Sequence, residues 1–338
     1  MDPTHNQQHT TQRSDPIGDT DQSQIAMLYS LAVAVTSVSV APVPVPSVHP
    51  DRASQIANIT KLAMTWHAYP HPRFADQPVG ASKSLLGVHG NWAAEIRDSI
   101  RMGEVEEYVP SEATANAEIP ASFDSETNWP DCAKIIGDIR DQSNCGCCWA
   151  FAGAEAASDR MCIATKAKIQ LPLAAEDVCF NAGGFFSSGC NGGQITTPWS
   201  FISSKGAVTG GNFKGTGPMG GGFCSAYSLP HCHHHGPQGN DPYPAEGAPG
   251  CPSEKSPKGP KKCDAGADAD HSDYEADKYT FSGRAQTASG VTAVQQMIME
   301  GGPVETAFTV YCALSHPLPS AQTHCSSSAP IALACAPP

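Results

Sequence analysis

One cysteine stands where it could act as a nucleophile. Cys148 opens a proline-free, alanine-rich run, 149–160, that is apolar on more than one side, which predicts a buried helix. A cysteine in the first turn of such a helix lies beside unsatisfied backbone N–H groups and the positive end of the helix dipole, and both favour thiolate over thiol. Gln142, six residues earlier, could donate its amide to an oxyanion formed beside the sulfur. These two residues predict nucleophilic catalysis by a thiolate.

Two other interpretations of the same stretch have to be weighed. Cysteine is among the most buried residue types, and the chain has 14 cysteines, so a single cysteine is more often a disulfide or core residue than a nucleophile. The run Cys145-Gly146-Cys147-Cys148 is also Cys-x-x-Cys, the spacing of thioredoxin-like redox sites. No strand-like run with a tryptophan precedes it, so we favour the nucleophile.

Composition narrows the class of protein. A chain of 338 residues with 40% hydrophobic residues can bury a large core and form more than one domain. The formal net charge of −13 argues against a nucleic-acid partner, because no basic stripe is available to neutralise phosphates. Fourteen cysteines at irregular spacing, with 31 glycines and 29 prolines, favour a disulfide-stapled protein of the secretory pathway.

The composition of the N-terminal segments predicts a sorting signal rather than part of a hydrophobic core. Residues 1–24 are polar without apolar periodicity, and we expect them to be disordered. The uncharged apolar run 25–41 has the length of a signal-peptide core rather than a membrane span, and Met27 is a candidate start; a signal anchor or a buried strand is the alternative. A proline-rich spacer, 42–46, follows. We therefore expect secretion or delivery to a lysosome or vacuole, without stable membrane insertion after signal cleavage.

The stretch around Cys148 resembles a known family signature. Gln-x-x-Cys-Gly-x-Cys-Trp-Ala-Phe, which begins at Gln142, is similar to the active-site signature of papain-like cysteine peptidases. The resemblance implies that Cys148 is the nucleophile and Gln142 the oxyanion donor. It also implies an α+β fold of two domains, a helical left domain and an antiparallel β-barrel right domain. Cys147 departs from the pattern, because the family has a small residue there, and an extra thiol could form a wrong disulfide.

Within that family the chain resembles cathepsin B-like enzymes. The run Ile119–Asp124 is similar to their mature start, and the likeness continues to Tyr311, so the peptidase domain is expected over 119–311. The segment 42–118 resembles a linker and a short inhibitory propeptide, which lies through the active-site cleft in reverse; Ser84-Leu85-Leu86-Gly87 belongs to its leucine-containing turn. The partners implied are peptide or protein substrates and the chain's own propeptide, with no cofactor.

The resemblance also assigns residues that contact substrate. Gly192 and Gly193 leave the backbone bare, so that an extended substrate can pair with it. His234 and His235 match the histidine pair of the occluding loop: His235 would bind a substrate's C-terminal carboxylate, giving dipeptide release, and His234 would pair with Asp141 to hold the loop shut. A metal site in this histidine run is the alternative; neighbouring residues of an extended loop do not converge on one ion, so we expect none.

The family's disulfide pattern gives a partial set of cysteine pairs. Cys179 stands alone where cathepsin B has two cysteines, so either it pairs with Cys263 or one of the two is free. The implied pairs are Cys132–Cys162, Cys145–Cys190 and Cys232–Cys251.

The C-terminal part departs from the family. The run 291–300 predicts a helix and 303–311 a barrel strand, but residues 312–338 contain no Asp, Glu, Lys or Arg. A family member would continue with Gly-Gly-His-Ala and Asn-Ser-Trp segments, which bring the general base and the residue that orients it. Neither His316 nor His324 has that context. We expect an incomplete right domain, with an open strand edge at four residues: Val304, Ala307, Phe308 and Val310.

Two functions follow from this sequence. The first is a cathepsin B-like cysteine peptidase precursor, an endopeptidase with dipeptidyl-carboxypeptidase activity, whose tail 312–338 is translated from an unspliced intron or a shifted frame. The second is a catalytically inactive pseudo-peptidase or binding module, because the chain as written lacks the catalytic His and Asn.

Overall fold

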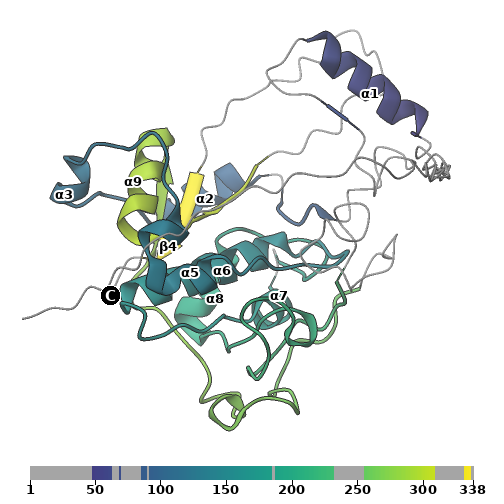
Figure 1. The fold of residues 1–338 in the computed structure, drawn as a ribbon, viewed down its shortest axis with the longest axis vertical. Coiled ribbons are helices and arrows are strands. Elements are labelled where there is room, and N and C mark those ends of the chain that lie inside the picture. Colours follow the sequence, from purple (N-terminus) through teal and green to yellow (C-terminus); the bar gives the residue numbers. More distant parts are fainter. Residues whose placement is uncertain are drawn as a thin grey trace, which may run out of the picture. The chain divides into compact units, whose positions relative to one another are not determined.

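The computed structural model describes residues 48–62, 68–69, 85–89, 91–184, 187–231, 255–308 and, for the backbone, 331–335. All of them belong to the compact unit Pro46–Pro338. The helices are α1 Pro50–Lys61, α2 Trp92–Met102, α3 Glu112–Ala115, α4 Ser125–Asn128, α5 Ala133–Ile136, α6 Cys148–Ala164, α7 Ala175–Asn181, α8 Thr197–Lys205 and α9 Val291–Gly301 (Figure 1). The strands are β1 Val105–Glu107, β2 Ala285–Ser289, β3 Glu305–Thr306 and β4 Ile331–Cys335. Short 3-10 helices cover Pro130–Cys132 (η2), Phe213–Gly215 (η3) and Ala269–His271 (η4).

Helix α6 forms the centre of the core, as its composition predicts. Trp149, Ala150, Ala154 and Ala157 have no solvent exposure, and α7 and α8 pack against the helix (Figure 1). Its many small side chains allow this close approach: a Cβ at Gly153 would collide with the α8 proline that faces it. The predicted helix at 149–160 is confirmed, and α6 extends it at the C-terminal end to Ala164.

A buried arginine ties α6 to the C-terminal part of the domain. Arg160 donates from Nε to the Pro303 carbonyl at 2.7 Å, and from Nη2 to the Met297 and Gly302 carbonyls at 3.1 and 2.8 Å. These carbonyls lie at the end of α9, which needs donors for its unpaired carbonyl groups. The predicted helix at 291–300 is confirmed, with one further residue, Gly301.

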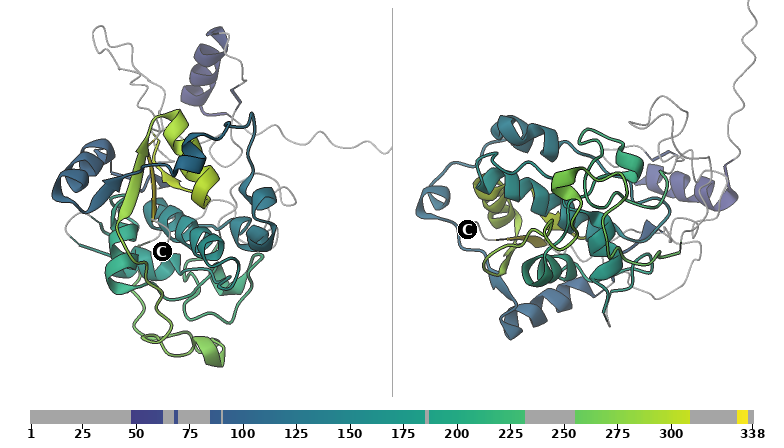
Figure 2. Two further views of the ribbon diagram at one scale, coloured as in Figure 1. Left: turned by 90° about the vertical axis from the view of Figure 1, so that its left-hand side faces the viewer. Right: turned by 90° about the horizontal axis from the view of Figure 1, so that it is seen from below.

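The sheet has four strands in the order β1-β2-β4-β3. Strand β1 pairs parallel with β2, Val105 opposite Ala285, and β4 pairs antiparallel with both β2 and β3. Figure 2 shows the strands beside α9. Two segments outside the range 119–311 therefore supply strands: β1 from the expected propeptide and β4 from the C-terminal tail.

The prediction of an open strand edge after residue 303 is wrong in part. Strand β3 is shorter than the predicted strand, and it pairs with β4, because the tail returns to the sheet between β2 and β3. Ala307 is buried and Val304 is half-buried, whereas Phe308 is 79% exposed as expected. Val310 lies outside the described residues.

Several N-terminal predictions also fall outside the described residues: the extension 1–24, the apolar run 25–41 and the spacer 42–46. Among the residues that are described, no helix is both long enough and apolar enough to cross a lipid bilayer.

Candidate functional site

Cys148 is the first residue of α6 and the one free cysteine among the described residues. Its side chain is half-buried, and the backbone N–H of Gly87 donates to its Sγ atom at 3.2 Å. The contact comes from a segment 61 residues earlier in the chain. We call residues 85–89 the cleft segment.

The pKa of the Cys148 thiol is raised, which corrects the expectation of a thiolate stabilised by the helix. Burial is the largest cause, and the carboxyl group of Glu305 adds to it; the N–H groups of Gly87 and Trp149 act in the opposite direction. The N–H groups at the start of the helix favour thiolate, but desolvation by burial outweighs them. Sequence reasoning could not include this effect, because the burial of one side chain depends on the whole fold.

Gln142 faces the same segment. Its Nε2 atom donates to the carbonyl oxygen of Leu85 at 3.3 Å, and the Tyr227 hydroxyl donates to its backbone carbonyl at 3.0 Å. The cleft segment that bonds to the Cys148 thiol therefore also presents a peptide carbonyl to the Gln142 amide, and a peptide carbonyl is the kind of group that becomes an oxyanion during acyl transfer. Its role as oxyanion donor stays a prediction.

Gly193 pairs with the cleft segment as a strand. It donates to the Gly87 carbonyl at 2.8 Å and accepts from His89 at 3.2 Å, and Val88 and Gly193 form a parallel bridge. A Cβ at Gly193 would lie 2.6 Å from the ring of Trp149, so only glycine fits there. The bare backbone predicted to receive substrate is thus occupied by residues 87–89.

Helix α2 fixes the segment that follows the cleft segment. Trp92 and Ile96 are buried in the main core. The Glu95 carboxylate accepts from the N–H and the hydroxyl of Thr196, at 3.0 and 2.5 Å, and burial raises its pKa. Gly103, in the left-handed conformation (φ 73°), ends the helix.

A further contact lies beyond β1. The Tyr108 hydroxyl donates to one carboxylate oxygen of Glu300, and the Ser111 N–H donates to the other at 3.3 Å. Although desolvation raises the pKa of Glu300, the hydrogen bonds from Tyr108, Ser111 and Thr114 together lower it. The segment 85–115 therefore contacts the domain at the cleft, in the core and on α9.

Asp141 has a histidine partner other than the predicted His234. His231 Nδ1 lies 3.3 Å from Asp141 Oδ2, both side chains are almost fully buried, and Thr216 Oγ1 contacts the other ring nitrogen at 2.6 Å. Asn212 accepts from the Asp141 N–H at 3.0 Å. Sequence reasoning missed His231 and Asn212; a histidine immediately before the loop cysteine was the available signal. His234, His235, Cys232 and Cys251 lie outside the described residues.

The cysteine pairing differs from expectation at one point. The structure contains Cys132–Cys162 and Cys145–Cys190 disulfides. Both alternatives suggested for Cys179 and Cys263, a bond between them or one free thiol, are wrong: the extra Cys147 bonds to Cys179, and Cys263 bonds to Cys224. The physical reason is proximity, since α7 places Cys179 against the start of α6, where Cys147 is fully buried.

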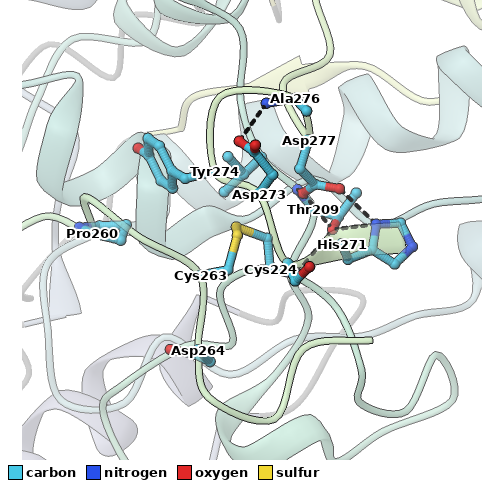
Figure 3. Close-up of a disulfide and its surroundings, with 12 residues drawn as sticks. Thr209, Cys224, Pro260, Cys263, Asp264, His271, Asp273, Tyr274, Ala276 and Asp277 are labelled. Carbon is cyan, nitrogen blue, oxygen red and sulfur yellow. Dashed lines mark hydrogen bonds and ion pairs between the residues drawn. A yellow bond between two sulfur atoms is a disulfide. The ribbon is translucent and has the colours of Figure 1, made fainter. Parts of the chain in front are cut away.

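A Thr–His–Asp cluster beside the Cys224–Cys263 disulfide resembles a catalytic arrangement (Figure 3). Thr209 Oγ1 and Asp277 Oδ1 lie 3.3 and 2.6 Å from the same nitrogen, Nδ1 of His271, and Thr209 also donates to Asp277 at 2.7 Å. A proton relay needs the two partners on different ring nitrogens. The cluster therefore fastens the loop at 264–277 and has no catalytic geometry.

No contact between Cys148 and an imidazole is found within the described part of the chain. His316 and His324 lie outside it. The described site therefore holds a peptide strand, with the Cys148 thiol bonded to the Gly87 N–H and the Gln142 amide bonded to the Leu85 carbonyl.

Comparisons with known proteins agree with this geometry. The papain family cysteine protease model matches residues 119–324, so the likeness extends beyond Tyr311, where we expected it to stop. Cathepsin B-like cysteine proteinase 6 of Caenorhabditis elegans is 35% identical over 73% of this chain and 60% of its own length, and cathepsin B-like cysteine proteinase 4 is 40% identical over 57% and 53%. The chain thus spans between about half and three fifths of these relatives' lengths.

A solved structure supports the fold. The structure of procathepsin B S9 from Trypanosoma congolense matches with a TM-score of 0.55 at 22% identity, over 77% of this chain and 72% of that one. The α+β fold predicted from the sequence is therefore the papain-like fold. Together with a family match over more than half of its residues, this shows that the chain belongs to the papain family of cysteine proteases, with cathepsin B-like proteinases among its relatives.

Proposed function

We propose that the chain is a cathepsin B-like cysteine peptidase precursor in which the cleft segment keeps Cys148 from substrate. One observation carries the proposal: residues 85–89 bond to the thiol, to the Gln142 amide and to the Gly193 backbone. A peptide substrate needs these same three groups. The parallel pairing of Val88 with Gly193 accords with a propeptide that runs through the cleft in reverse.

In the proposed reaction, the Cys148 thiolate attacks a peptide carbonyl carbon. A C–S bond forms while the carbonyl oxygen takes the electron pair and is stabilised by the Gln142 amide. The C–N bond then breaks, the amine leaves with a proton, and water hydrolyses the thioester. The group that carries the proton is an imidazole in this family, and the described residues do not supply it.

Finer features of the proposal concern specificity and location. The buried Asp141–His231 pair anchors the start of the loop that carries His234 and His235, so a closed loop that binds C-terminal carboxylates, and hence dipeptide release, is part of the proposal. Four disulfides among the described residues favour the secretory pathway and a lysosomal, vacuolar or extracellular destination.

A second candidate function is a pseudo-peptidase that binds peptides without cleaving them. The observation that favours it is the lack of an imidazole on Cys148 among the described residues. The test is to remove residues 1–118 by limited proteolysis and to follow both epoxide labelling of Cys148 and hydrolysis of a fluorogenic peptide. Labelling with hydrolysis supports the peptidase; labelling without turnover supports the binding module. If Cys148 reacts no faster than a denatured thiol, the proposed peptidase is refuted.

Gln142→Ala is expected to lower kcat about 10²- to 10³-fold in the processed enzyme, the usual effect of losing one oxyanion donor. The measurement is peptide hydrolysis beside epoxide labelling, which should continue because the thiol is retained. Gln170→Ala is the matched control, since Gln170 is exposed and its side-chain amide donates to the Ala167 carbonyl. Equal kcat values for the Gln142 variant and this control would contradict the assigned role.

Tyr108→Phe is expected to loosen the segment around residue 108 without disturbing the cleft. The ring stays packed beside Met297, whereas the hydrogen bond to Glu300 is lost. A hydrogen bond contributes about 0.5–1.5 kcal/mol, so proteolysis at the exposed Val109 should become roughly two to twelve times faster. Tyr69→Phe serves as the control, because Tyr69 is 78% exposed. Unchanged proteolysis in Tyr108→Phe would mean that Glu300 does not hold this segment.

A further inference from the structure

A hollow with a volume of about 230 Å³ lies outside the cleft and is walled largely by bare backbone. None of the groups that the cleft segment bonds to, Cys148, Gln142 and Gly193, lines it. Six of its ten lining residues are glycines, and its two charged residues are Lys214 and Asp264. Pockets for drug-sized ligands measure about 300–1,000 Å³, so this hollow suits a smaller molecule.

The glycines bring two stretches of chain together and leave peptide groups uncovered. A Cβ at Gly215 would lie 2.5 Å from the Cα of Gly221, so the two stretches approach each other more closely than side chains permit. Within the described part of the chain, no acceptor is found for the N–H groups of Gly221 and Gly222. Such donors suit a ligand that carries a peptide carbonyl oxygen.

The two charged residues that line the hollow have opposite signs. Lys214 Nζ lies 5.0 Å from the centre of the Phe213 ring, and no ion pair involves this lysine among the residues that the structure describes. Asp264 Oδ2 accepts from the Ala226 N–H at 2.9 Å, and the Asp264 N–H donates to the Cys224 carbonyl at 2.7 Å. A ligand with one positive and one negative end is therefore complementary to this lining.

We propose that the hollow binds a free dipeptide of small residues in its zwitterionic form. The ammonium group pairs with Asp264, the carboxylate with Lys214, and the peptide group between them bonds to the glycine backbone. A second carboxylate, that of Asp268, lies against Gly222. Because negative charges outnumber the lysine, an anion without an ammonium group is disfavoured. The proposal does not depend on peptidase activity.

The test titrates Ala-Ala into the full, unprocessed chain with Cys148→Ala and measures the heat of binding. The substitution removes the nucleophile, and the cleft segment occupies the cleft of the unprocessed chain. One dipeptide per chain is expected. Three ligands should each bind at least tenfold more weakly: N-acetyl-Ala-Ala, which lacks the ammonium group, Ala-Ala amide, which lacks the carboxylate, and free alanine, which lacks the peptide group.

Two substitutions assign the two ends of the ligand. Asp264→Asn removes a charge but keeps an acceptor for the Ala226 N–H, and Lys214→Met removes a charge without adding a branch at a left-handed residue (φ 52°). Each should weaken Ala-Ala at least tenfold. Lys214→Met should abolish the preference for Ala-Ala over its amide, and Asp264→Asn the preference over the acetylated form. The controls Lys168→Met and Asp131→Asn, at exposed residues outside the lining, should leave the affinity unchanged.

Several outcomes would overturn the proposal. They are no binding of Ala-Ala, equal binding of a blocked dipeptide or of alanine, and binding that survives both substitutions. His235→Ala should leave the affinity unchanged; loss of binding in that variant would place the dipeptide at the occluding loop instead and would equally refute the site. Because binding is measured in an unprocessed chain without Cys148, failure of the proposed peptidase function leaves this test unaffected.

Discussion

The substitution Gly87→Ala is expected to make Cys148 of the unprocessed protein react about 5 to 150 times faster with an epoxide probe. A Cβ at Gly87 would collide with the carbonyl group of Gly146 and lie 3.0 Å from Cys148 Sγ, and the backbone atoms of residue 146 cannot move aside freely. Overpacking of this kind costs about 1–3 kcal/mol, and each 1.36 kcal/mol is tenfold in an equilibrium. The added methyl group should therefore displace the cleft segment in a larger fraction of molecules.

The experiment compares alkylation rates of the unprocessed proteins, with the site located by mass spectrometry. Gly266→Ala is the matched control, because its Cβ would meet nothing within 4 Å and its backbone needs no left-handed conformation. A fourfold or smaller change for Gly87→Ala would mean that the segment is absent from the cleft in solution or adjusts without leaving it. Equal acceleration by Gly266→Ala would point to general destabilisation.

The sequence was sufficient for elements whose signal is local. Helix α6 follows from a proline-free run of small residues, and α9 from an apolar run ended by Gly301 and Gly302; the structure has both within a few residues. The motif Ser84–Gly87 located a segment expected in the cleft. The motif could not predict which residue of the segment faces which group of the cleft, because only the fold brings Gly87 to Cys148 and Leu85 to the Gln142 amide.

The remaining differences come from segments distant in sequence. The raised pKa of the Cys148 thiol depends on burial of the sulfur in the folded protein, which outweighs the backbone N–H groups around it, and the spacing of residues along the chain does not reveal this burial. The Cys147–Cys179 bond depends on α7 packing against α6, which no cysteine spacing reveals. The pairing of β4 with β3 also depends on residues distant in sequence. Whether a charge-free tail forms a strand depends more on the strands it pairs with than on its own composition.

The folded protein is expected to lose stability between pH 5 and pH 8.5 because of two acids on α6, the half-buried Glu155 and the buried Asp159. Burial, opposed by the Arg140 guanidinium, raises the pKa of Glu155 to about 8 and that of Asp159 to about 7, and Asp138, paired with Arg140 at 2.8 Å, adds repulsion. An acid whose pKa is higher in the folded state than in the unfolded state adds most to the free energy of unfolding at a pH below its unfolded-state pKa. The contribution disappears as pH rises through 7 to 8, roughly 2–4 kcal/mol for each group.

Asp159→Asn tests this assignment, because the amide cannot ionise. The variant should match the wild type at pH 5 and exceed its Tm by about 5–15 °C at pH 8.5, as measured by thermal unfolding of the full chain. Glu118→Gln is the control, since Glu118 is exposed. Because the Asp159 charge raises the pKa of Glu155, the variant should also lower that pKa, so that the remaining loss of stability is smaller and is complete at a lower pH. If Asp159→Asn and Glu118→Gln respond to pH alike, the buried acids do not govern stability, and the loss arises from other groups.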